Sequence, residues 1–68
     1  MTLKELRKQN KKTVAEVAKV LGIARSTFSN YEQGTRTIDI QHIMPLSNLY
    51  DCSAEDIIVA QINSLNAR

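Results

Sequence analysis

Apolar residues recur at helical intervals on either side of Gly22, within residues 13–32. They are Val17, Leu21, Ile23, Phe28 and Tyr31, with the small residue Ala18 between the first two. Spacings of three and four residues place side chains on one face of a helix, so each half of this stretch has one face to bury. A chain that reverses within about three residues needs positive φ, and Gly22 has no Cβ to oppose it. The pattern predicts two short helices that cross steeply at Gly22, with Ala18 where their axes are closest.

Three short polar signatures mark helix starts elsewhere in the chain. They are the pairs Thr2–Glu5, Thr13–Glu16 and Ser53–Asp56. In such a capping box the first side chain accepts a hydrogen bond from the backbone amide of the helix's third residue, whose own side chain reaches back. Together with the apolar spacing, these signatures predict five helices and no strand. The expected ranges are residues 3 to 9 or 10, 14–21, 25–32, 40–50 and about 54–65.

Two of these helices have weaker local signals. The third would have Ala24 at its N-cap, where alanine has no side-chain acceptor; a good cap is typically worth ~1 kcal/mol. The fourth could be capped by Asp39, but Pro45 in its second turn lacks the amide that an α-helix uses there. We therefore expect the fourth helix to be kinked or irregular before Pro45. His42 is expected on the surface or at a helix cap.

The length of 68 residues and the composition indicate one all-α domain spanning residues 1–68. A single cysteine excludes an intramolecular disulfide, and no Cys/His cluster indicates a metal site, so Cys52 is expected to be a small core residue. No apolar run reaches the length of a membrane span, and the N-terminus lacks the apolar core of a signal peptide. We expect a soluble, cytoplasmic protein without a metal or cofactor.

Charge is distributed unevenly along the chain. Residues 1–36 contain eight Lys or Arg and three acidic residues, which gives +5, whereas residues 37–68 contain one Arg and four acidic residues, which gives −3. A basic half favours a polyanionic partner such as nucleic acid. An imbalance of this size is equally compatible with an ordinary solvated surface, and it is the neighbouring two-helix motif that favours nucleic acid.

These elements together resemble the phage Cro/repressor-like (XRE) helix-turn-helix proteins. The resemblance extends over about residues 3–59 and is carried by LKELR at 3–7, TVAEVAKVLG at 13–22, IARSTFSNYEQG at 23–34 and LYDCSAEDI at 49–57. It implies a compact five-helix, lambda-repressor-like DNA-binding domain of bacterial or phage type. The helix-turn-helix, formed by the second and third helices, would occupy about residues 13–32. The implied partner is double-stranded operator DNA in the nucleoid.

The resemblance also implies an ion pair and includes three departures, one of which is Pro45 inside the fourth helix. In that family an arginine in the first helix pairs with a glutamate that ends the recognition helix, and the matching residues are Arg7 and Glu32. Val14 stands where a glutamine commonly contacts a phosphate, and Lys11 and Lys12 replace the usual Gly-Leu. Because the side chain of Val14 cannot bind a phosphate, a backbone amide at this helix start would have to do so.

A recognition helix in the major groove presents its N-terminal and outward side chains to the bases. Since Phe28 and Tyr31 are expected in the core, the expected base contacts are Arg25, Ser26, Ser29 and Asn30, although Ser29 could equally be filler. Arginine can bind guanine O6 and N7, and asparagine can bind adenine N6 and N7. Phosphate contacts are expected from the rim of the motif, at Lys11, Lys12, Thr13, Gln33, Thr35 and Arg36.

One recognition helix covers only a few base pairs, so such domains usually bind as dimers over half-sites about one helical turn apart. An apolar stripe formed by Ile58, Ile62 and Leu65 predicts a small homodimer interface, although it could instead pack on the domain's own core. The leading hypothesis is a sequence-specific transcriptional regulator of the repressor type. The alternative is an antitoxin-like module that masks a partner toxin. The sequence contains neither a nucleophile–base pair nor paired carboxylates that would indicate an enzyme.

Overall fold

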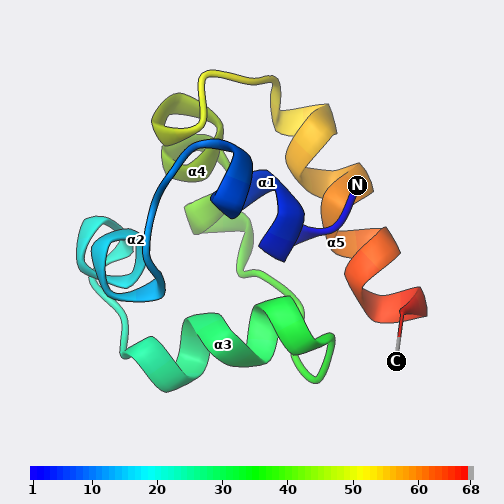
Figure 1. The fold of residues 1–68 in the computed structure, drawn as a ribbon, viewed down its shortest axis with the longest axis horizontal. Coiled ribbons are helices and arrows are strands. Elements are labelled where there is room, and N and C mark those ends of the chain that lie inside the picture. The colour runs from blue at the N-terminus through cyan, green and yellow to red at the C-terminus, as the bar shows by residue number, and fades with distance from the viewer. Residues whose placement is uncertain (68) are drawn as a thin grey trace.

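The computed structural model describes residues 1–67, and every element among them is helical (Figure 1). Their bounds are α1 Leu3–Gln9, α2 Val14–Leu21, α3 Arg25–Gln33, a short 3-10 helix η1 Ile40–His42, α4 Ile43–Leu49 and α5 Ala54–Asn66. The predicted all-α class is confirmed. The predicted ranges differ mainly in the fourth helix, which is divided, and in α3, which extends one residue further to Gln33. In Figure 1, α3 lies at the base, α2 on the left and α5 along the right.

The three predicted capping boxes are present and start α1, α2 and α5. The Thr13 hydroxyl oxygen accepts the amide hydrogen of Glu16 at 3.1 Å, and the Thr13 amide donates to Glu16 Oε1 at 2.9 Å. The hydrogen bond from the Thr13 amide lowers the pKa of the Glu16 carboxyl, because it favours the charged form. The same reciprocal bonds are made by Thr2 with Glu5 and by Ser53 with Asp56. Each box satisfies two donors that a bare helix start would leave free.

Each of the first four α-helices is followed within two residues by a residue in the left-handed region of φ. These residues are Lys11 (φ 57°), Gly22 (φ 70°), Gly34 (φ 77°) and Asp51 (φ 51°). In each case the amide of the following residue donates to a carbonyl five residues back, as Ile23 does to Ala18 at 3.0 Å. This is the Schellman motif. Glycine adopts it without strain, whereas the Cβ of Lys11 and of Asp51 makes the conformation less favourable.

The fourth predicted helix is divided into η1 and α4, and Pro45 lies in the first turn of α4. Proline is tolerated there because the first-turn amides have no acceptor within the helix. The irregularity predicted before Pro45 is confirmed. Asp39 makes no side-chain cap, so that detail was wrong. His42 is at the N-cap position of α4, one of its two expected places, but it makes no side-chain cap bond and is buried, with 9% of its surface exposed. The 3-10 turn moves the start of the α-helix away from Asp39 and places His42 against the interior.

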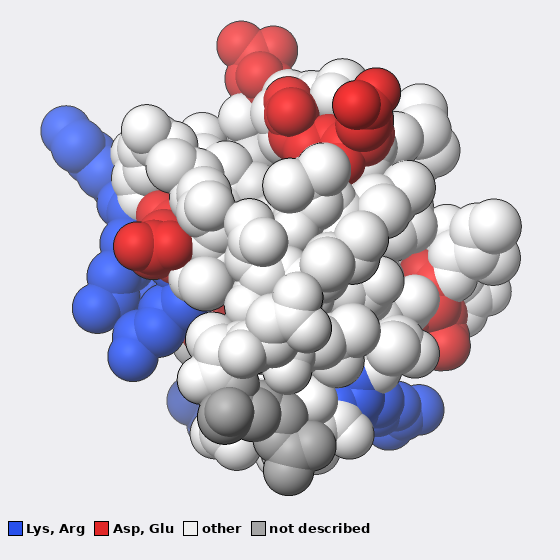
Figure 2. All heavy atoms as spheres, turned by 90° about the vertical axis from the view of Figure 1, so that its right-hand side faces the viewer, with Lys and Arg blue, Asp and Glu red and all other residues white. Residues whose placement is uncertain are grey.

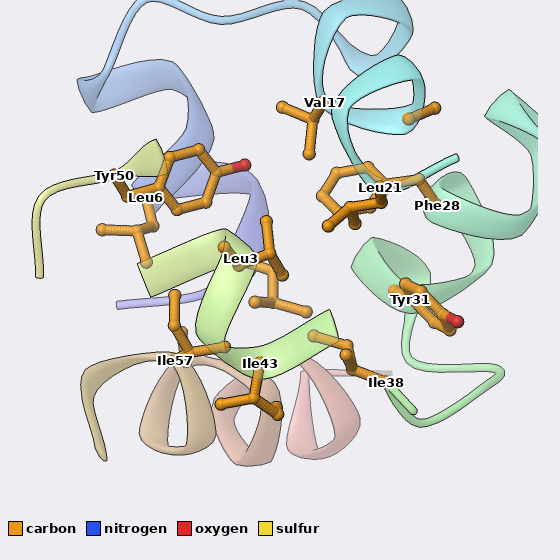
Figure 3. Close-up of a cluster of buried hydrophobic side chains, with 13 residues drawn as sticks. Leu3, Leu6, Val17, Leu21, Phe28, Tyr31, Ile38, Ile43, Tyr50 and Ile57 are labelled. Atoms are coloured by element: carbon orange, nitrogen blue, oxygen red, sulfur yellow. The ribbon is translucent and has the colours of Figure 1, made fainter. Parts of the chain in front are cut away.

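The core is a single cluster of apolar side chains between the helices (Figure 3). Its largest fully buried members are Tyr31, Phe28, Leu3, Leu46, Ile57 and Val17. Phe28 and Tyr31 meet edge to face, with ring centroids 6.1 Å apart, and Ala18 is buried, as a close helix crossing requires. Cys52 is only partly buried against this cluster, so it is less of a core residue than the sequence indicated. Burial of both rings fixes which face of α3 points outward.

The last helix, α5, holds two distant parts of the chain in place. The backbone amide of Leu3, at the start of α1, donates to Ser64 Oγ at 2.9 Å. The backbone amide of Ile38, in the loop after α3, donates to the side-chain carbonyl of Gln61. Since both partners lie on α5, this helix fixes the start of α1 relative to the end of α3.

The strain that a positive φ imposes on Lys11, just after α1, can be tested by mutation. Replacing Lys11 with glycine removes the Cβ that opposes φ 57°, whereas Lys12 is not at positive φ and has no such strain to lose. Both variants lose one cation and gain one flexible residue, so Lys12→Gly is the matched control. We expect Lys11→Gly to be more stable than Lys12→Gly by about 1 kcal/mol in free energy of unfolding, measured in urea. Equal stabilities would contradict strain at Lys11.

Candidate nucleic-acid interface

The outward face of α3 is polar and accessible. Phe28 and Tyr31 are the buried side chains of this helix and define its inner face. Of the four residues predicted to read bases, Arg25, Ser26 and Asn30 are exposed and Ser29 is half-buried. The helix can therefore present all four to a ligand, with Ser29 at the margin. Base reading by these residues stays a prediction.

The start of α3 has no cap of its own. Ala24 provides no side-chain hydrogen bond, as the sequence indicated, and no acidic residue lies in the first turn. The first amides of the helix therefore point outward without a side-chain acceptor. Arg25 adds a positive charge at this end, which is unfavourable for the helix itself. Both features suit an external anion or acceptor at this end of α3.

Arg7 on α1 binds two other segments at once. Its Nε donates to Glu32 Oε2 at 2.6 Å and its Nη2 to Glu32 Oε1 at 3.2 Å, which forms the ion pair expected at these positions. Its Nη1 donates to the backbone carbonyl of Lys12 at 2.9 Å, a contact that the sequence did not indicate. The two charged side chains are only 11% and 7% exposed. The hydrogen bond to Glu32 raises the pKa of Arg7. We call this arrangement of Arg7, Glu32 and Lys12 the arginine clamp.

The arginine clamp brings together the two segments predicted to contact phosphates. Because the Lys12 carbonyl and the Glu32 carboxylate bind one guanidinium, the loop before α2 lies beside the end of α3. Lys12 is half-buried, whereas the other rim residues, Lys11, Thr13, Gln33, Thr35 and Arg36, are exposed. The Thr35 hydroxyl donates to the Asn30 carbonyl at 3.2 Å, so it is less available to a phosphate than the sequence indicated.

Tyr50 lies near the arginine clamp, which the sequence did not predict. Its hydroxyl is buried and has no hydrogen-bond partner among the described residues. Burial, with the nearby charge of Glu32, raises the pKa of the phenol, so it stays neutral. In Figure 3 the hydroxyl points into the interior, on the side of Val17. Ile43, Leu46 and Tyr50 have the spacing of one helical face, which indicates that the ring is buried but does not place its polar end.

The outer face of α5 is apolar but differs from the predicted stripe. Ile58 and Ile62 are 44% and 49% exposed, whereas Leu65 is half-buried. Val59, which the sequence analysis did not select, is 48% exposed. Figure 2 looks onto this side of the molecule, and its centre is free of Lys, Arg, Asp and Glu. Ile57 is fully buried, so the two adjacent isoleucines divide between the core and the surface.

Three further features of residues 1–67 concern membrane spans, metal ligands and the cysteine thiol. No helix there combines the length and the apolar character needed to cross a membrane. No group of three or more His, Cys, Asp or Glu residues in that range is placed to hold a metal ion. Cys52 is a free thiol, and burial raises its pKa, which reduces its reactivity.

Two helices that cross at Gly22, with the polar face of the second left open, define a helix-turn-helix DNA-binding domain. The family model described as helix-turn-helix matches residues 3–57. The chain belongs to the XRE-type helix-turn-helix family of DNA-binding transcriptional regulators.

Several curated relatives carry similar sequences. The chain is 36% identical over 61 residues to the uncharacterized HTH-type transcriptional regulator YqaE of Bacillus subtilis, covering 90% of this chain and 53% of YqaE. It is 34% identical over 56 residues to the HTH-type transcriptional regulator AnsR of the same organism, covering 82% of this chain and 48% of AnsR. The antitoxin PezA of Streptococcus pneumoniae is 34% identical over 56 residues, covering 82% of this chain and 35% of PezA. The chain thus spans about half the length of the two regulators. No solved structure matches it significantly.

The arginine clamp makes a prediction about stability. Glu32→Gln keeps the shape of the side chain but leaves the guanidinium of Arg7 without its counter-charge at a site that is mostly dry. We expect a loss of about 2 kcal/mol in free energy of unfolding, and a Tm lower by roughly 10 °C. Glu55→Gln, at an exposed position, is the matched control and should change stability by less than about 0.5 kcal/mol. A Glu32→Gln variant as stable as its control would rule out a structural role for the pair.

Proposed function

We propose that this protein is a sequence-specific regulator that binds an inverted-repeat operator as a homodimer and represses transcription in the bacterial cytoplasm. The observation that carries the proposal is the open polar face of α3, held by the arginine clamp beside a basic loop. A helix of this width fits the major groove of B-DNA, and its exposed side chains then face the base edges. A regulator that occupies its operator excludes a polymerase by its presence alone, so repression needs no surface beyond the polar face of α3 and the basic loop.

Base reading depends chiefly on two side chains of α3. Arg25, at the exposed first position, can bind guanine O6 and N7 with two parallel hydrogen bonds. Asn30, which is also exposed but lies more than one turn later and about 140° further around the helix, can pair its amide with adenine N6 and N7. Ser26 and Ser29 are short, so the helix backbone can approach the bases closely between these two contacts.

Phosphates on either side of the groove are bound by the rim of the motif. Before α2 these contacts come from Lys11, Lys12 and Thr13, and after α3 from Gln33, Thr35 and Arg36. Val14 offers no polar side chain for a phosphate contact at the start of α2. This contact is made instead by the free backbone amides at that start and by Lys11 and Lys12. The rim fixes the register of the helix on the duplex but does not distinguish sequences.

The two kinds of contact can be separated by mutation. Arg25→Ala should relax sequence preference at one position of each half-site by roughly 5- to 150-fold, because a bidentate pair discriminates by ~1–3 kcal/mol. Arg36→Ala should instead weaken binding to all sequences alike and reduce the slope of log K against log salt by about 1 per monomer. Selection of bound sequences from random duplexes, followed by titrations at several salt concentrations, measures both. Failure of the wild-type protein to enrich an inverted repeat would refute the proposal.

A second candidate is an antitoxin-like module that masks a partner toxin and regulates its own operon. It is favoured by the exposed apolar face of α5 and by the similarity to a protein named as an antitoxin. This candidate predicts that the protein co-purifies from its own host with a stoichiometric partner that covers α5. A homodimer that binds its operator without any partner, and a host extract that yields none, would exclude it.

A further inference from the structure

A groove of about 400 Å³ lies between α1 and the turn that leads into α5. Its apolar lining comes from Leu6 on α1, from Val59 and Ala60 on α5, and from Met1. The side-chain amide of Asn63 donates to the Met1 carbonyl at 2.8 Å, which holds the N-terminal residue against α5. Leu6 and Ala60 are buried, whereas Met1 and Val59 are 56% and 48% exposed. The groove therefore has an apolar floor and an open apolar edge, which an inserted apolar group would cover.

The rim of the groove is negatively charged. Asp51 and Asp56 line it, and no Lys or Arg of the described residues does so. Glu55 precedes Asp56 in the first turn of α5, and all three acidic side chains are exposed. Burial raises the pKa of the Cys52 thiol, and the nearby charges of Asp56 and Asp51 raise it further. Figure 2 shows acidic atoms gathered at the top of this side of the molecule, above an uncharged centre.

We propose that this groove docks a cationic segment of another protein, in which an apolar side chain fills the groove and neighbouring Lys or Arg residues pair with the carboxylates. Nucleic acid is excluded from this site, because its phosphates would be repelled by Asp51 and Asp56. The same acidic surface of a second copy is disfavoured for the same reason. Complementary charge across such a contact selects the partner more than it adds affinity.

The position of the groove allows the protein to hold a partner and DNA at the same time. In Figure 1 the turn before α5 lies at the end of the molecule opposite α3. The stripe predicted for a homodimer, Ile58, Ile62 and Leu65, does not line the groove. A segment docked in the groove thus leaves both α3 and this stripe free. It also differs from the toxin of the antitoxin candidate, which would cover the outer face of α5.

Short random peptides displayed on phage test this chemistry without a known partner. Immobilised wild-type protein should enrich peptides that combine Lys or Arg with at least one large apolar residue. Their affinity should fall as salt is added, because the charges at the rim are exposed to solvent. Enrichment of acidic or uncharged peptides, or of none, would overturn the proposal. No DNA is present in this selection, so its outcome is independent of the proposed function.

Cys52 reports whether an enriched peptide occupies the groove, because it is the only cysteine in the chain and lines this site. A saturating amount of the synthetic peptide should slow alkylation of the thiol by N-ethylmaleimide at least about tenfold, since covered thiols are inert. Protein alkylated beforehand should bind the peptide at least about tenfold more weakly, because the adduct fills the groove. Cys52→Ser treated with the same reagent is the matched control and should bind like the untreated wild type. A peptide that binds while Cys52 reacts at its full rate would overturn the proposal.

Two substitutions that each remove one negative charge test the role of the rim. Asp51→Asn should weaken peptide binding about threefold or more, and asparagine tolerates the φ of 51° at this position. Asp39→Asn is the matched control, because Asp39 is exposed, makes no side-chain cap and does not line the groove. It should change the affinity by less than about 1.5-fold. Circular dichroism verifies that both variants are folded, and equal effects of the two substitutions would overturn the proposed pairing at the rim.

Discussion

One guanidinium, that of Arg7, joins the three segments on which the rest of the site depends. From α1 it binds the carboxylate near the end of α3 and the carbonyl that precedes α2. The donors of a guanidinium lie in one fixed plane, so two acceptors bound to it cannot move independently. Desolvation offsets much of the attraction in such a pair, so its net contribution to stability is modest. Its main effect is geometric: a rigid side chain sets the distance between the basic loop and the helix that we propose reads the operator.

Much of the fold could be predicted from the sequence because most helix boundaries are encoded within a few residues. The start of α2 depends on Thr13 and Glu16, and its end on Gly22, so both are visible in a short window. The boundaries of η1 and α4 are different. Asp39 has the residue type of a cap but makes none, and His42 is buried. The course of this segment depends on tertiary packing, since α4 packs against α5 and α2. No local pattern contains that information.

The candidate site likewise has one part that could be predicted from the sequence and one part that could not. The exposed face of α3 follows from helical periodicity once Phe28 and Tyr31 are assigned to the core, so Arg25 and Asn30 could be selected from sequence alone. The exposure pattern of α5 could not. The Asn63 side-chain amide donates to the Met1 carbonyl at 2.8 Å, so the N-terminal segment lies against a helix more than fifty residues later in the chain, and Val59 is 48% exposed whereas Leu65 is half-buried.

The distribution of helix-end bonds has a consequence for folding kinetics. α1 and α2 have a capping box at the start and a Schellman motif at the end, and all of these bonds join residues at most five apart. α3 has no cap at its start. Local contacts close short loops at little entropic cost and therefore form early. We expect α1 and α2 to be largely formed in the folding transition state, with α3 consolidating against them. Like α4, which also starts without a side-chain cap, the helix with the open polar face therefore depends more on its neighbours for its order than α1 and α2 do.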